Sequence, residues 1–300
     1  MDFKLKNIPD QKGRVAIVTG ANNGIGFETT LALAKYGFKV VMGCRNKEKA
    51  EIAKAKILAK VPSADLEIIS LDLSDLESVK AFANSFNSNY SKLDVLINNA
   101  GILSYSGKKN KAGIELQFAT NHLGHFLLTN LLLDKIPDNS SSRIVALSSV
   151  AHKGARIHFD DINCENSGGG TAYGQSKLAN LMFADELSRR LKKINKNITA
   201  LAVHPGGSDS GLFEEMSRAQ YFMLKVLKPF ISHSNASAAK PSLFAALSPD
   251  VNDGEYFGPQ GFNELRGRVG VAKRSEYSNR KDIAEKLWKI SEEMTNQSFL

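Results

Sequence analysis

The sequence predicts an α/β fold built on one doubly wound parallel sheet. Short apolar runs typical of strands alternate with longer segments of helical apolar spacing, which is the pattern of that fold class. The strand runs are continuously apolar, and this indicates a sheet that is buried on both faces. No internal repeat or long linker divides the chain, so we expect a single domain over residues 1–300.

The expected elements follow one another along the chain. Strands are predicted at residues 14–19, 39–44, 66–71, 93–97, 143–147, 198–203 and 254–257. Helices are predicted at residues 24–36, 47–60, 76–88, 114–133 and 172–193, and a C-terminal loop and helix over 259–300 include a closing helix at 282–294.

One segment departs from this alternation. Within residues 207–240, which we expect to cover the substrate, residues 212–231 carry many large apolar side chains without a preceding strand. Three interpretations are open for it: a hydrophobic lid over a pocket, an ordinary core helix or subunit contact, and a helix on a membrane surface.

Composition limits the partners that the chain can have. The net charge of +8 is spread over helix-like stretches, and no basic run is interleaved with aromatic residues, so we expect no nucleic-acid surface. Cys44 and Cys164 lie far apart, and His122 and His125 have no neighbouring ligand motif, so neither a disulfide framework nor a metal site is expected. The polar N-terminus and the lack of an 18-residue apolar run predict a cytoplasmic protein without a transmembrane segment.

The first predicted strand runs directly into a glycine-rich turn, Gly20-Ala-Asn-Asn-Gly24-Ile-Gly26, which opens a helix. Glycines allow a tight turn and a close approach of the backbone, and the helix N-terminus offers free amides to a pyrophosphate. We therefore expect a Rossmann-type dinucleotide site here, with Asn22, Asn23 and Ile25 beside the glycines.

Tyr173 and Lys177 lie four residues apart at the start of a predicted helix, so their side chains share one helix face. A phenol has an ordinary pKa of about 10, and a fixed ammonium group beside it favours the phenolate. Such a pair can pass a proton to a carbonyl oxygen. The spacing also occurs by chance, and the alternative interpretation is a solvated helix face.

Taken together, these motifs resemble those of the short-chain dehydrogenases/reductases. The glycine turn, Asn98-Asn-Ala-Gly101 and Tyr-x-x-x-Lys occur in the family's order over residues 13–257. The chain is most similar to the branch that contains the retinol dehydrogenases, the WW-domain-containing oxidoreductase and protochlorophyllide reductase. That similarity rests on Cys44-Arg45-Asn46, residues 148–152, residues 173–180 and His204-Pro-Gly206.

The resemblance implies a catalytic set of Asn121, Ser149, Tyr173 and Lys177. In that set Tyr173 exchanges a proton with the substrate oxygen, so its pKa must fall toward the working pH. Lys177 lowers this pKa and holds the nicotinamide ribose. Ser149 orients the substrate oxygen, and Asn121 holds a water that links Lys177 to solvent.

The end of the second strand predicts the cofactor. An acidic residue there would bind the ribose 2′-hydroxyl and repel a 2′-phosphate, but the chain has Cys44 followed by Arg45. A guanidinium group suits the 2′-phosphate, so we expect NADP(H), although Arg45 as an ordinary surface cation is the alternative. The remaining cofactor contacts that the resemblance implies are Asp72, Leu73, Asn98, Ala100, Gly101, Pro205, Gly206, Ser208 and Ser210. Ser208 and Asp209 bring unusual polarity to this position.

We therefore expect an NADP(H)-dependent oxidoreductase that acts on a small apolar carbonyl or alcohol, as a homodimer or homotetramer. A non-catalytic NADP(H)-binding scaffold or redox sensor is the alternative, although a scaffold has no need of the proton relay. A sugar-nucleotide epimerase or dehydratase would require glycine at Asn23. A protochlorophyllide reductase is less expected, because Leu178 and Ala179 stand where that enzyme has a cysteine after Lys177.

Overall fold

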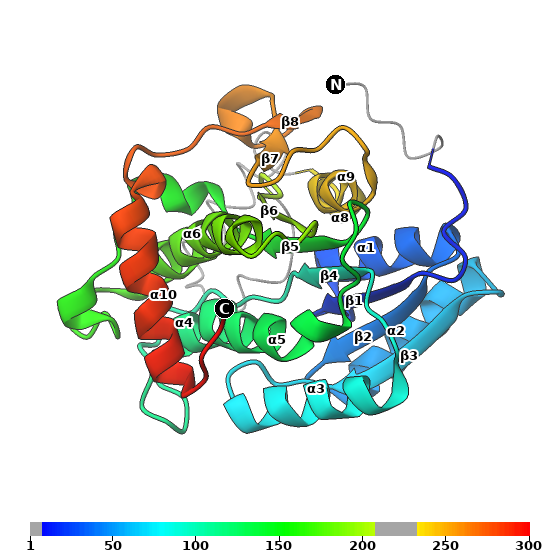
Figure 1. Ribbon diagram of the computed structural model, residues 1–300, viewed down its shortest axis with the longest axis horizontal. Coiled ribbons are helices and arrows are strands. Elements are labelled where there is room, and N and C mark those ends of the chain that lie inside the picture. Colours follow the sequence, from blue (N-terminus) through cyan, green and yellow to red (C-terminus); the bar gives the residue numbers. More distant parts are fainter. Residues whose placement is uncertain (1–7, 208–232) are drawn as a thin grey trace, which may run out of the picture.

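The structure, a computed structural model, describes residues 8–207 and 233–300 and is organised around one sheet (Figure 1). The strand order is β3-β2-β1-β4-β5-β6-β7-β8, and all neighbours pair in parallel except β7 and β8. The strands are β1 (Val15–Thr19), β2 (Lys39–Cys44), β3 (Asp65–Ser70), β4 (Val95–Asn98), β5 (Arg143–Leu147), β6 (Thr199–Val203), β7 (Tyr256–Pro259) and β8 (Val269–Val271).

Helices cover both faces of the sheet, as a doubly wound fold requires (Figure 1). One apolar core lies between the sheet and α1, α2 and α9, and the other lies between the sheet and α3, α5 and α6, against which α10 packs. The helices are α1 (Gly24–Lys35), α2 (Lys47–Lys60), α3 (Leu76–Asn89), α4 (Leu116–Phe118), α5 (Gly124–Leu132), α6 (Gly169–Lys193), α8 (Asn235–Ala238), α9 (Lys240–Leu247) and α10 (Lys281–Thr295). Local capping sets several starts; α2, for example, begins where the Asn46 side chain accepts a hydrogen bond from the Lys49 N–H.

The predicted fold class is confirmed, and the differences are local. The helix predicted at 114–133 is divided into α4, a π-turn (Ala119–Leu123) and α5. Strand β8 and the short helices α8 and α9 were not predicted, because elements this short show too little apolar periodicity to be recognised. The apolar segment 212–231 lies outside the described residues, while α8 packs against α1.

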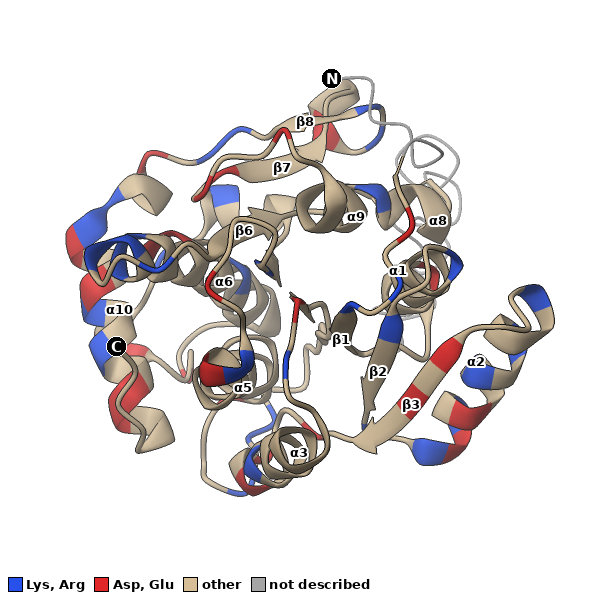
Figure 2. Cartoon of the chain, turned by 45° about the vertical axis from the view of Figure 1, so that its right-hand side comes forward, with Lys and Arg blue, Asp and Glu red and all other residues tan. Residues whose placement is uncertain are grey.

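Charged side chains of both signs are interspersed on the outer helices, especially α2 and α10 (Figure 2). None of the helices that the structure describes is long and apolar enough to cross a lipid bilayer.

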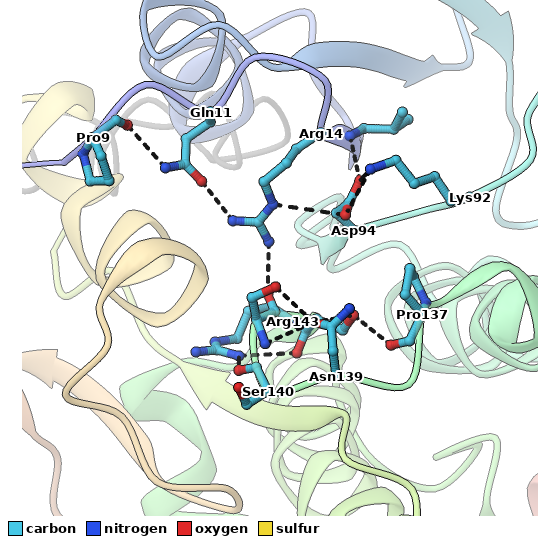
Figure 3. A network of polar contacts seen from close by, with 12 residues as sticks. Pro9, Gln11, Arg14, Lys92, Asp94, Pro137, Asn139, Ser140 and Arg143 are labelled. Atoms are coloured by element: carbon cyan, nitrogen blue, oxygen red, sulfur yellow. Dashed lines mark hydrogen bonds and ion pairs between the residues drawn. The ribbon is translucent and has the colours of Figure 1, made fainter.

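A polar network closes the amino edge of the sheet (Figure 3). The Asp94 carboxylate accepts a hydrogen bond of 2.8 Å from the Val15 N–H and lies 3.2 Å from Lys92 Nζ and 3.9 Å from Arg14 Nε. Arg14 also donates to the Ser141 carbonyl at 2.7 Å. These contacts join the start of β1 to the turn before β5, which leaves the opposite, carboxyl edge to the functional loops.

Candidate active site

A cavity of about 440 Å³ opens at the carboxyl edge of the sheet, where the chain leaves β1, β2, β4 and β5. Ligands of doubly wound folds bind at this edge, beside the point where the strand order reverses. Fourteen residues expected to bind the cofactor or substrate line this cavity: Gly20, Asn22, Asn23, Gly24, Ile25, Gly26, Arg45, Asp72, Leu73, Ala100, Gly101, Tyr173, Lys177 and Pro205.

The glycine turn is shaped by close backbone contacts. Gly20 has a φ of +65°, a conformation that other residues rarely adopt. A Cβ atom on Gly26 would lie 2.2 Å from the Gly20 carbonyl oxygen, so only glycine fits this crossing. The first turn of α1, with Gly24, Ile25 and Gly26, lines the cavity, and the Asn23 side chain at its start accepts a hydrogen bond of 2.8 Å from the Gly24 N–H.

Two residues that sequence reasoning missed hold the loop after β4 against this turn. Thr19 Oγ1 accepts hydrogen bonds of 2.9 Å from the backbone N–H groups of Asn99 and Ala100. The Asn99 side chain donates to the Thr19 carbonyl at 2.7 Å and lines the cavity. Asn98, which we expected in the wall, is absent from it: its amide is buried and donates to Thr129 Oγ1 at 2.9 Å. The pair Asn98-Asn99 indicated a cofactor contact in the sequence, but the motif alone did not show which of the two side chains faces the cavity.

Tyr173 and Lys177 stand on the first turns of α6 and both line the cavity. Lys177 Nζ donates to the Leu147 carbonyl at 3.2 Å and lies 5.8 Å from the centre of the Tyr173 ring. A Cβ atom on Gly101 would lie 3.0 Å from Lys177 Nζ, so the loop after β4 runs tightly over the lysine. The fold thus encloses the ammonium group in protein.

Burial dominates the electrostatics of this pair. Desolvation lowers the pKa of Lys177 from 10.5 to about 8. Burial raises the pKa of Tyr173 to about 12, against the lowering effect of a hydrogen bond with Ser149. This differs from the expectation that Lys177 brings the pKa of Tyr173 down: in the protein alone, desolvation of the phenolate is the larger effect. At neutral pH Tyr173 is therefore a phenol that can donate a proton, and Lys177 is mostly a cation.

Ser149 lies directly after β5 and caps the short turn Val150–Gly154, where its Oγ accepts from the Ala151 N–H at 3.2 Å. The same side chain hydrogen-bonds Tyr173. Its neighbour Ser148 is buried and donates instead to the Lys177 carbonyl at 2.7 Å. Of the two serines, Ser149 is thus the one joined to the side chain of Tyr173.

Asn121 lies in the π-turn that divides the predicted helix, and such turns occur frequently at functional sites. Its side chain is fully engaged: Oδ1 accepts from the Ile102 N–H at 2.8 Å, and Nδ2 donates to the Ile102 carbonyl at 3.0 Å and to Ser176 Oγ at 2.9 Å. These bonds tie the loop after β4 to α6. The backbone carbonyl of Asn121 accepts from His125 Nδ1 at 2.9 Å, and Asn121 is not among the residues that line the cavity.

The two ends of the cavity differ in character. At one rim Arg45 is exposed beside buried Cys44, whose thiol pKa burial raises to about 11. At the other end Pro205 lines the wall and is followed by Gly206, while Ser208 and Ser210 lie outside the described residues. The wall also contains residues that the sequence analysis did not assign to the site, four of them in the loop after β4: Gly43, Leu71, Ile102, Leu103, Ser104, Lys108, Leu116, Thr120, Leu147 and Ser148.

Comparison with known proteins agrees with this geometry. The family model for short chain dehydrogenase matches residues 14–220. The chain belongs to the short-chain dehydrogenase family. It is 39% identical over 288 residues to retinol dehydrogenase 12 of Mus musculus, covering 94% of this chain and 86% of that protein. It is also 39% identical over 293 residues to the chloroplastic short-chain dehydrogenase TIC 32 A of Brassica napus, covering 94% of this chain and 88% of that one. The expected retinol dehydrogenase-like branch is confirmed.

Solved structures share the fold of this short-chain dehydrogenase. An uncharacterized protein from Mycobacterium paratuberculosis superposes with a TM-score of 0.81 at 36% identity, over 99% of both chains. A short-chain dehydrogenase from Shigella flexneri complexed with NADP superposes with a TM-score of 0.64 at 22% identity, over 82% of this chain and 96% of that one, which is a likeness of fold.

As an oxidoreductase of this family, the short-chain dehydrogenase uses a nicotinamide cofactor, and the cavity fits one. The fit rests on the cradle at Gly20 and Gly26. A Cβ atom on Gly20 would meet Ala100 in the loop after β4, and a Cβ atom on Gly26 would meet the Gly20 carbonyl. Within residues 8–207 and 233–300, no group of three His, Cys, Asp or Glu side chains could hold a metal ion.

Proposed function

We propose that the protein is an NADP(H)-dependent oxidoreductase that interconverts an apolar aldehyde or ketone and the corresponding alcohol. The observation that carries the proposal is one cavity lined both by Tyr173 and Lys177 and by the glycine cradle, with Ser149 hydrogen-bonded to Tyr173. A proton donor and a dinucleotide site on one cavity suit hydride transfer to a carbonyl.

The cofactor supplies or accepts the hydride at the carbonyl carbon. In the reductive direction the Tyr173 hydroxyl donates its proton to the carbonyl oxygen, and the Ser149 hydroxyl donates a hydrogen bond that orients this oxygen. Lys177, held by the Leu147 carbonyl, places a positive charge near the phenolate that forms. The reverse sequence of steps oxidises the alcohol. That Asn121 holds a water linking Lys177 to solvent stays a prediction from the amino-acid sequence.

Two features support NADP(H) over NAD(H). Cys44 replaces the acidic residue that would repel a 2′-phosphate, and Arg45 stands on the cavity rim at the same strand end. The Shigella flexneri relative of the same fold was crystallised with NADP.

The apolar substrate class is supported by the wall and by the relatives. Ile102, Leu103 and Leu116 line the cavity. Several relatives, including retinol dehydrogenase 12 of Mus musculus, are named for an apolar alcohol, retinol. The cytoplasmic location and the homodimer or homotetramer stay predictions from the sequence.

The test is a panel of carbonyl compounds, from short aldehydes to retinal-like and steroid-like ketones, with NADPH oxidation followed by absorbance. Tyr173→Phe removes the proton donor and is expected to lower kcat by at least about 100-fold. NADPH affinity should stay within about threefold, because the phenol contributes little to cofactor binding. Tyr277→Phe, in a turn that packs against Arg156, is the matched control. Full activity of Tyr173→Phe would defeat the assignment.

Cofactor choice is tested separately with Arg45→Ala. Loss of the guanidinium should reduce the preference for NADPH over NADH in kcat/KM by about 10- to 100-fold, the value of one or two charge-assisted hydrogen bonds. Lys193→Ala, which removes an exposed cation from α6, is the control. A wild-type protein that prefers NADH would contradict the proposal.

A further inference from the structure

The loop between β7 and β8 holds a buried carboxylate on an unusual backbone. Asn263 and Glu264 have φ values of 48° and 57°, in the left-handed region, which asparagine adopts readily but which costs a glutamate about 1 kcal/mol or more. Glu264 is only 6% exposed, and its Oε1 accepts from the Lys273 N–H at 2.8 Å. A buried charge on strained backbone calls for a function beyond closing a hairpin, because a glycine and a neutral residue would close it at lower cost.

Glu264 reaches the turn of the candidate catalytic serine. Its Oε2 accepts a hydrogen bond of 2.6 Å from Lys153 Nζ, and Lys153 belongs to the turn Val150–Gly154 that Ser149 caps. In the same turn His152 Nδ1 is 2.6 Å from the Ser149 carbonyl, which can only accept, so this nitrogen carries the proton. The Tyr256 ring packs edge-on against His152, with ring centres 5.3 Å apart. The turn is thus held from the side of β7.

Glu264 Oε2 also faces a second turn, which follows β6 and contains Pro205 and Gly206. His204 Nε2 lies 3.8 Å from Glu264 Oε2, and His204 Nδ1 accepts from the Gly206 N–H at 3.3 Å. Burial lowers the pKa of His204 to about 4, so the ring is neutral, with its proton on Nε2 toward the carboxylate. The residue after Glu264 completes the contact, because the Leu265 carbonyl accepts from the Gly207 N–H at 2.8 Å.

We propose that Glu264 is a positioning residue that links the turn carrying Ser149 to the turn carrying Pro205 and Gly206. Ser149 hydrogen-bonds Tyr173, while Pro205 lines the cavity beside the expected nicotinamide. The link sets the spacing between the substrate oxygen and the hydride donor, and it rests on the proposed function. Misplacement by about 1 Å can lower a transfer rate by about 100-fold, so a small release of either turn is expected to affect the rate.

A purely stabilising ion pair makes a different prediction. The Lys153 side chain is 36% exposed, so water screens its charge and the pair contributes little to the free energy of unfolding. Loss of the pair should therefore slow hydride transfer more than it destabilises the protein.

The experiment compares Glu264→Gln, Lys153→Met and their double variant with wild type. Three quantities are measured. The first is the single-turnover rate of hydride transfer at saturating NADPH, the second is the Kd of NADPH from the fluorescence of the bound nicotinamide, and the third is the free energy of unfolding in urea. Glu77→Gln, which removes a carboxylate paired at 2.8 Å with Lys80 on the surface of α3, is the matched control. Lys153→Arg, which keeps the positive charge, is the rescue variant.

We expect Glu264→Gln and Lys153→Met each to slow hydride transfer by about 10-fold or more and the double variant to be no slower than either, because both break one link. NADPH Kd should change less than about threefold, since the adenosine end is untouched. Lys153→Arg should keep most of the rate, and Glu77→Gln all of it. Single variants with the wild-type rate, or a double variant with multiplied losses, would overturn the proposal.

Two further results separate the possible failures. If wild type turns over no carbonyl compound, the proposed function fails, and the fluorescence of bound NADPH then decides the inference. The fluorescence spectrum of bound NADPH should differ between wild type and Glu264→Gln. Identical spectra would overturn the proposal that Glu264 links the two turns. If Glu264→Gln does not fold, Lys153→Met alone decides, because its partly exposed side chain can be replaced without opening the core.

Discussion

Lys177 carries a positive charge that is buried in the folded protein. Replacing Lys177 with methionine measures the free-energy cost of burying that charge. Methionine keeps the length and the apolar stem of lysine. The Leu147 carbonyl loses the Lys177 donor at 3.2 Å but keeps the Asn180 amide at 2.9 Å, so the change leaves no buried acceptor without a partner. The ammonium group is therefore the main difference between the two proteins.

The size of the effect follows from the pKa of Lys177. At about 1.4 kcal/mol for each pH unit, the fall from 10.5 to about 8 corresponds to about 3 kcal/mol. Below pH 8 the lysine is charged in both the folded and unfolded states, and the folded state bears the full cost. Between pH 8 and 10.5 the folded protein releases this proton while the unfolded chain keeps it, so stability rises with pH.

We therefore expect Lys177→Met to be more stable than wild type by about 3 kcal/mol at pH 7 and by only about 1 kcal/mol at pH 9.5. Urea unfolding at both pH values measures the difference, and hydride transfer should fall by at least about 100-fold. Lys193→Met, at an exposed position on the same helix, should change stability by less than about 0.5 kcal/mol. A variant that is no more stable at pH 7, or a gain that does not shrink with pH, would refute the reasoning.

Three further changes test other parts of the molecule. Asp94→Ala removes a buried carboxylate that accepts from the Val15 N–H and lies beside partly buried Arg14, and should destabilise the protein by about 1–3 kcal/mol in urea unfolding, with NADPH affinity of the folded protein unchanged. Gly26→Ala places a methyl group 2.2 Å from the Gly20 carbonyl and should raise the Kd of NADPH by at least about 10-fold in a fluorescence titration; unchanged affinity would mean that the turn is not a phosphate cradle. Phe299→Ala empties the aromatic cluster at the C-terminus and should cost about 3 kcal/mol, and a melting temperature equal to that of wild type would show that the tail does not close the core.

The elements that the sequence predicted well are those whose signal is local. The parallel strands and the long helices each carry enough apolar side chains for their period to be read, and the glycine turn lies directly between the first strand and the first helix. Strand β8 is only three residues long, and the π-turn at Asn121 depends on hydrogen bonds from the side chain to Ile102 and Ser176. Neither feature has a local pattern, so neither was predicted.

The candidate site divides in the same way. Tyr173 and Lys177 were found because four residues of helix place two side chains on one face. The choice between Asn98 and Asn99 depended on which side chain faces Thr19 at the end of β1, a contact across about 80 residues of sequence. Glu264 gave no signal at all, because its partners Lys153 and His204 come from two other parts of the chain.

By itself, the sequence determined the order of strands β1 to β7 and of the long helices, the glycine turn and the pairing of Tyr173 with Lys177, since each depends on residues within a few positions of one another. The tertiary structure decided the protonation of that pair. Desolvation comes from every element packed around a group, and here it raises the pKa of Tyr173 and lowers that of Lys177, opposite to the effect that an ammonium beside a phenol predicts in water. The spacing selects the two residues, and the surrounding fold sets which of them holds the proton.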